Sequence, residues 1–82
     1  MSGLAEIHQL LTAARAGVGD GRAHAERART LLGDARRALV DAQAKADPWL
    51  PGQWAQADEA IEHLLTRLAA ADDLVGGYQS RL

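Results

Sequence analysis

The chain has 82 residues, which is enough for one small domain whose own core would be marginal. Its formal net charge of −2 argues against nonspecific nucleic-acid binding, and the absence of cysteine excludes disulfides, thiolate metal sites and a cysteine nucleophile. No apolar run approaches the about 18 residues that a membrane-spanning helix needs, so we expect no membrane insertion. The opening MSGLAEIHQLL has no basic leader, so we expect a protein that is cytoplasmic, or exported without a cleavable signal peptide.

Small apolar residues recur at alternating steps of three and four from Leu4 to Ala46. This is a heptad pattern of about six repeats, in which the positions called a and d face another helix. The a positions are Leu4, Leu11, Val18, Ala25, Leu32, Leu39 and Ala46, and the d positions are Ile7, Ala14, Gly21, Ala28, Ala35 and Ala42. The pattern predicts a helix over about residues 3–46.

Three glycines, Gly17, Gly19 and Gly21, lie close together within this first predicted helix. In a continuous helix they cost about 3 kcal/mol relative to alanine. That cost favours a break, which would give a three-helix bundle. The heptad phase runs through the glycines without a slip and favours a continuous helix, which is the architecture we expect.

A turn is predicted at about residues 47–52, where Asp47-Pro48 and Pro51-Gly52 interrupt the pattern. A second heptad run follows over about 53–81. Its a positions are Trp54, Ile61, Leu68, Val75 and Leu82, and its d positions are Ala57, Leu64, Ala71 and Tyr78. Because so short a link makes two helices antiparallel neighbours, the sequence predicts an all-α, antiparallel two-helix hairpin forming a single domain.

A hairpin folded about residue 50 gives specific contacts between the two helices. Tyr78 then faces Gly21, where the missing side chain leaves room for the ring. Arginines occupy position e of the first helix, and antiparallel pairing of the e positions brings Arg29 near Asp72. Trp54 is expected to close the end of the core.

In this register the second helix ends opposite residues 17–18, so residues 3–16 lack a partner within the hairpin. Leu4, Ile7, Leu10 and Leu11 would each gain about 1.5–3 kcal/mol from burial. Either they fold back as a short third helix, or they pack on another chain. We expect the second, as a homodimer forming a four-helix bundle or as docking on a helical partner, with Trp49 at the hairpin tip as a further interface residue.

Catalytic and metal-binding patterns are few. Glu59 with His63, and Asp20 with His24, sit one helical turn apart, but neither a Glu-x-x-His nor a His-x-x-x-His motif is present. No serine, histidine and acid form a recognisable nucleophilic arrangement. We therefore expect no enzyme and no cofactor, and we keep a small metal- or ligand-binding helical bundle as the alternative function.

Two resemblances bear on function. The opening SGLAEIHQLLTAAR, the Asp47-Pro48 turn and the aromatic Tyr78 shortly before Ser-Arg-Leu resemble a family of short, alanine- and arginine-rich helical proteins of unknown function from actinobacteria. Related stretches precede deaminase-type domains in secreted polymorphic toxins. This resemblance implies a targeting or adaptor role.

The layout also looks, more remotely, like the WXG-motif substrates of type VII secretion, which are dimerising helical hairpins. The turn here reads Trp49-Leu50-Pro51-Gly52, one residue longer than Trp-x-Gly, and the tail has Leu82 where the export signal has an acid. These departures argue against export by that system for this chain alone. Residues and resemblances together predict a non-enzymatic protein–protein interaction module, such as an adaptor or a secretion- or toxin-associated subunit.

Overall fold

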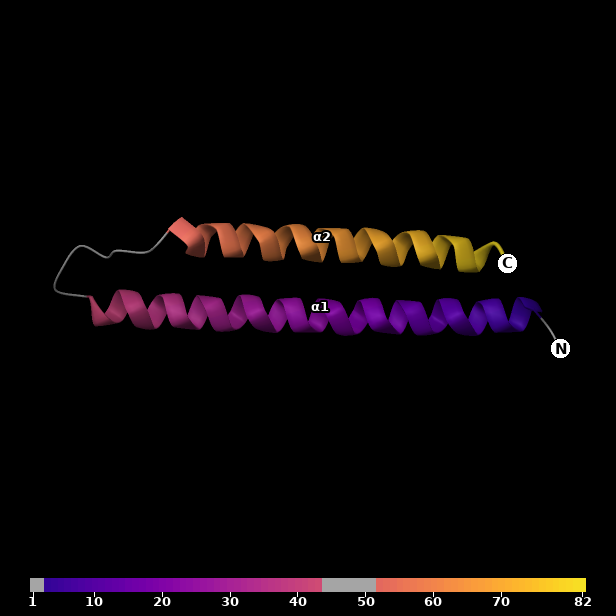
Figure 1. Ribbon diagram of the computed structural model, residues 1–82, viewed down its shortest axis with the longest axis horizontal. Coiled ribbons are helices and arrows are strands. Elements are labelled where there is room, and N and C mark those ends of the chain that lie inside the picture. The colour runs from indigo at the N-terminus through magenta and orange to yellow at the C-terminus, as the bar shows by residue number, and fades with distance from the viewer. Residues whose placement is uncertain (1–2, 44–51) are drawn as a thin grey trace.

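The computed structural model describes residues 3–43 and 52–82, which form two long helices. Helix α1 spans Gly3–Ala42 and helix α2 spans Gly52–Ser80. They run antiparallel side by side, with both termini at the same end of the molecule (Figure 1). The predicted all-α helical hairpin is therefore confirmed. Helix α1 stops four residues before its predicted end and Gln43 lies in a turn, while the predicted interface residue Trp49 lies outside the described residues.

Helix α1 runs without interruption through the segment that holds Gly17, Gly19 and Gly21. No described glycine has a positive φ, so the three glycines keep ordinary helical backbone. The three-helix alternative, which required a break here, does not occur. Side-chain packing along the whole of α1 offsets the low helix propensity of glycine, as tertiary contacts commonly do.

The a positions of the two helices meet along the hairpin. All of those from Leu11 to Leu39 on α1 and from Trp54 to Val75 on α2 are half-buried, and Ala25 is buried with 6% of its surface exposed. No other described residue is buried. The molecule measures 68 × 15 × 14 Å, so it is a narrow rod more than four times as long as it is wide. A rod of this kind leaves most side chains in contact with solvent.

The register of the two helices differs from the predicted one. Arg29 pairs with Glu62 instead of Asp72, and Asp72 pairs with Arg15. Arg15 precedes the predicted partner of Asp72 by fourteen residues, whereas Glu62 precedes the predicted partner of Arg29 by ten. The heptad pattern indicates which columns face each other but does not fix how far one helix is shifted along the other, so it does not distinguish between these registers.

This register also corrects the prediction that residues 3–16 lack a partner. The side-chain amide of Gln79, near the end of α2, donates to the hydroxyl of Thr12 at 2.9 Å and to the backbone carbonyl of His8 at 3.4 Å. Leu11 is half-buried in the hairpin. The C-terminal part of α2 therefore covers the N-terminal part of α1, because the shift in register moves it there.

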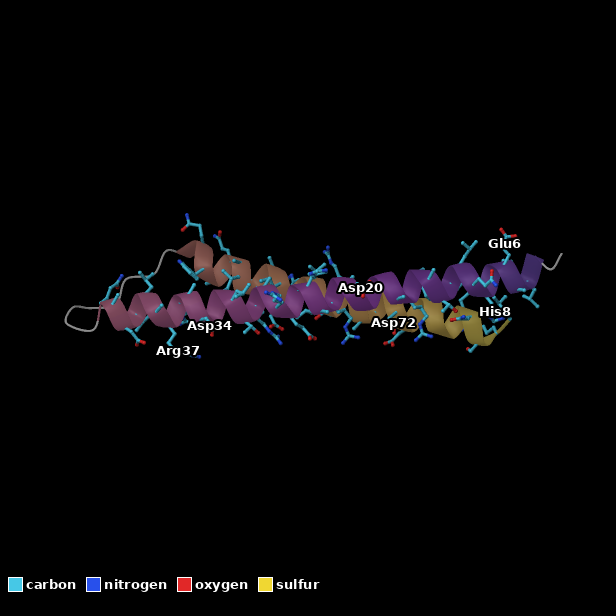
Figure 2. The ribbon with its side chains drawn as sticks, turned by 90° about the horizontal axis from the view of Figure 1, so that it is seen from below. Glu6, His8, Asp20, Asp34, Arg37 and Asp72 are labelled. Atoms are coloured by element: carbon cyan, nitrogen blue, oxygen red, sulfur yellow. The ribbon has the colours of Figure 1, made fainter. Side chains whose placement is uncertain are left out.

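The rotation of α2 about its own axis also differs from the prediction. Its second inward column is the e column, which comprises Asp58, Leu65, Asp72 and Gln79. The two large residues of the d column, Leu64 and Tyr78, are exposed, Tyr78 by 57%. The predicted packing of Tyr78 on Gly21 is therefore wrong, since a Cβ on Gly21 would instead lie 3.7 Å from Leu68. Seen from below, α2 crosses α1 at a shallow angle (Figure 2).

Candidate docking surface

One long side of the hairpin is held by polar contacts, and we call it the polar edge. It comprises His8, Thr12, Arg15, Arg29, Glu62, Asp72 and Gln79. Arg15 Nε donates to Asp72 Oδ1 at 2.9 Å, and Arg15 Nη2 donates to Asp72 Oδ2 at 3.3 Å. Figure 2 shows Asp72 at the margin of the two helices where they cross. This two-pronged contact fixes both the register and the side on which the e columns meet.

Electrostatics at this contact follow from its geometry. The hydrogen bond from Arg15, together with its positive charge, holds the pKa of Asp72 below its usual value, and the carboxylate raises the pKa of Arg15 further. The side chain of Asp72 is 27% exposed, so water still screens the pair. The pair therefore serves alignment more than stability.

Gly76, one turn beyond Asp72, provides the space in which the Arg15 guanidinium lies. A Cβ at this position would approach the Arg15 Cζ to 3.1 Å. On the next residue, Gly77, a Cβ would meet nothing within 4 Å. Gly76 thus has a packing role at the polar edge that Gly77 does not share.

The opposite long side of the hairpin carries large apolar side chains without cover, and we call it the open apolar face. The exposed large hydrophobic residues are Leu4, Ile7, Leu10, Leu31, Leu64, Leu74, Tyr78 and Leu82. All of them occupy positions d or g, except for the two terminal a residues. In an antiparallel pair whose a columns meet, both e columns share one side and both d columns share the other. The exposed apolar residues therefore gather on one side instead of being scattered.

The two helices contribute differently to this face. Beyond Ile7, the d column of α1 holds only alanine and glycine, namely Ala14, Gly21, Ala28, Ala35 and Ala42. The d and g columns of α2 carry Leu64, Leu74 and Tyr78, and Leu74 is 75% exposed. On α1 the large apolar residues of this face are Ile7, Leu10 and Leu31, and the d column between Leu10 and Leu31 is shallow, whereas on α2 bulky side chains project at Leu64, Leu74 and Tyr78. Such a surface can receive helices in close contact.

The predicted interface residues differ in their exposure to solvent in the structure. Leu4, Ile7 and Leu10 are exposed on this face, while Leu11 is half-buried within the hairpin. The sequence interpretation missed the contribution of α2, because it placed the d column in the interhelical contact. Leu31 and Leu74, at position g, could have indicated this face from the sequence. An apolar residue at g, beside the d column, makes the apolar stripe of a helix wider than contact with one neighbouring helix requires.

The histidine–acid pairs do not form a larger cluster. Asp20, His24, Glu59 and His63 are all exposed. Within residues 3–43 and 52–82, no three histidine, aspartate or glutamate side chains gather where they could hold a metal ion. Among the same residues, neither helix is apolar enough over a sufficient length to cross a membrane.

The fold and this surface define a two-helix antiparallel hairpin with one polar edge and one open apolar face. No family model, curated protein or solved structure matches the chain. The function is therefore argued from the surface itself.

Proposed function

We propose that the chain is a non-enzymatic helical interaction module that docks through the open apolar face. In this role it acts as an adaptor or as a subunit of a secretion- or toxin-associated assembly. The observation that carries the proposal is the gathering of six exposed large apolar residues, all at d or g positions, on one side. Scattered surface leucines need no explanation, whereas a contiguous apolar side is typical of an interaction site.

The small core of the hairpin supports the same proposal. Ala25 is the one buried residue among those described, and no large side chain there is fully buried. Stability in so small a domain comes from buried apolar area, and a chain that buries little gains from a partner that covers more. Docking on the open face would add such area.

Site-specific photo-crosslinking in cells that make the protein tests the proposal. A photoreactive residue at Leu74, on the open face, is expected to capture a defined protein. The matched control carries the same residue at Ala70, which is exposed on the outer side of α2. Equal labelling at both positions, or no defined product at Leu74, would contradict the proposal.

A further inference from the structure

The exposed area of the chain shows how much surface a partner could cover. The accessible surface is 6269 Å², whereas a compact monomer of 8.7 kDa exposes about 4,700 Å². The excess, about 1,500 Å², is well above the about 800 Å² that each partner contributes to a standard interface. Likewise, the radius of gyration is 19.1 Å, against about 12 Å for a compact chain of this length.

We propose that a second copy of this chain covers the open apolar face, with α1 of each copy packed on α2 of the other. The proposal rests on the function proposed above and names the partner. The two copies are related by a twofold axis that runs along the helices. Because this axis is parallel to the helices, it leaves the position of each residue along the rod unchanged. A residue of α1 is therefore level with the same residues of α2 in the partner as in its own chain.

Contacts within the hairpin fix these levels. Arg15 packs on Gly76, so Gly17, two residues later in α1, comes level with Leu74, two residues earlier in the antiparallel α2. Both residues occupy position g, which borders the d column on the open apolar face. A Cβ on Gly17 would meet nothing within 4 Å in the single hairpin. In the pair of hairpins, the most exposed leucine lies over a glycine that has no role in the monomer.

The same complementarity recurs along the face. Arg29 pairs with Glu62, so Leu64 comes level with the neighbourhood of Ala28 in the small d column of α1. Leu64 and Leu74 of α2 therefore meet small residues of α1. Packing α2 on α2 instead would set these bulky side chains against their own row and leave the small d residues of α1, from Ala14 to Ala35, facing one another. Large-on-small packing fills space better and favours the mixed arrangement.

Charge points to the same arrangement. The Gly21–Leu68 contact places Asp20 within two residues of the level of Arg67, and the His8–Gln79 contact brings Glu6 level with Arg81. The two arginines occupy position g of α2, and the two acids occupy position c at the outer margin of α1. None of the four makes an ion pair with the described residues of its own chain. In the dimer each arginine can reach an acid near its own level.

Packing α2 on α2 would have the opposite electrostatic effect. It would bring the g column that holds Arg67 and Arg81 against its own copy, with like charges facing. Like charges across a contact disfavour that arrangement. Charge thus selects which helix faces which, while the apolar rows supply the driving force.

Cysteine cross-linking tests the arrangement directly, because the chain has no cysteine of its own. One variant carries Leu31→Cys and the other, extended by a tag of different mass, carries Ala60→Cys. The Arg29–Glu62 contact places these two g positions at the same level along the proposed contact of α1 with α2. On mild oxidation, the mixture is expected to give the mixed disulfide, and each variant alone is expected to give none. Ala70→Cys, on the outer side of α2, is the matched control and is expected not to cross-link with either.

A charge exchange gives a second, independent readout. By sedimentation equilibrium the unmodified chain is expected to have twice its 8.7 kDa mass at micromolar concentration. Arg67→Glu is expected to weaken dimerisation about tenfold, because each dimer contains the pair twice. The double variant Arg67→Glu with Asp20→Arg is expected to recover most of the loss. If Arg67→Glu acted only by destabilising the hairpin, Asp20→Arg would not restore dimerisation, because residue 20 is out of reach of residue 67 in the same chain.

The outcomes separate this inference from the proposed function. A monomer throughout the micromolar range, or a dimer that cross-links through Leu31→Cys alone, overturns the arrangement proposed here. If the photoreactive residue at Leu74 captures a protein other than this chain, the open apolar face docks on that protein. The proposed function then stands, and a second copy is excluded as the partner. If it captures nothing defined, the proposed function fails as well.

Discussion

Arg15 and Asp72, fifty-seven residues apart in the chain, join the N-terminal half of α1 to the C-terminal half of α2. Two nitrogens of one guanidinium donate to the two oxygens of one carboxylate, at 2.9 and 3.3 Å. The Arg15 side chain reaches this carboxylate across Gly76, where no Cβ stands in its way. Together the three residues define the register of the hairpin.

A double-mutant cycle is expected to find energetic coupling between Arg15 and Asp72. Arg15→Gln and Asp72→Asn should each destabilise the hairpin slightly, and the double variant should lose less than the sum, because removing either side chain already abolishes the contact. The control cycle pairs Arg29→Gln with Asp72→Asn and is expected to be additive. Urea unfolding followed by circular dichroism measures both. Coupling in the control cycle would mean that the register is the one predicted from the sequence.

The stability of the hairpin is expected to decline with acid in a way that depends on Asp72. Because Arg15 holds the pKa of this carboxyl below its ordinary value of 3.8, its contribution to the free energy of unfolding is complete above that value. The contribution is lost as the pH falls below 3.8 through the lower pKa of the folded state. Asp72→Asn should remove this part of the decline.

Asp41→Asn is the matched control for the acid experiment. Asp41 is exposed and makes no ion pair with the described residues, so the decline attributed to Asp72 should persist in that variant. Thermal unfolding between pH 3 and pH 6 measures both variants. A slope that is unchanged in Asp72→Asn would contradict the role of the Arg15 contact.

The sequence predicts much of this fold, for reasons that are local. Heptad phase, the proline–glycine turn and the e-column arginines indicate two antiparallel helices whose a columns meet, and the structure confirms the all-α hairpin. Phase also argued correctly that the helix continues through Gly17–Gly21, where propensity alone favoured a break. Local periodicity is a strong signal because it repeats over many turns.

The register and the rotation of α2 could not be predicted in the same way. The heptad pattern does not fix how far one helix is shifted along the other, and the turn assumed about residue 50 gave a register that differs from the observed one by ten to fourteen residues. The apolar d column of α2 looked like the better inward face, whereas the e column with Asp72 and Gln79 faces α1. Specific polar contacts, which periodicity does not report, decide between these columns. The open apolar face was missed for this reason.

Neighbouring glycines in α2 offer a clean comparison of packing with propensity. Gly77→Ala should stabilise the hairpin by about 1 kcal/mol, because its Cβ meets open space and alanine favours the helix. Gly76→Ala should gain less, because its Cβ would displace the guanidinium of Arg15. Chemical denaturation of the two variants measures the difference. In a background of Arg15→Gln the two gains should become equal, and a difference that persists there would refute the explanation.

The close approach of the helices at Ala25 is expected to be intolerant of larger side chains. Ala25 is the one buried residue among those described, so Ala25→Leu must push the helices apart or strain its neighbours, at a cost of about 1–3 kcal/mol. The matched control, Ala23→Leu, makes the same change at an exposed position of the same helix and should alter stability by less than about 0.5 kcal/mol. Urea unfolding at one fixed protein concentration compares the two. Equal effects at positions 23 and 25 would show that the a columns do not meet at Ala25, and the packing of the hairpin would have to be assigned anew.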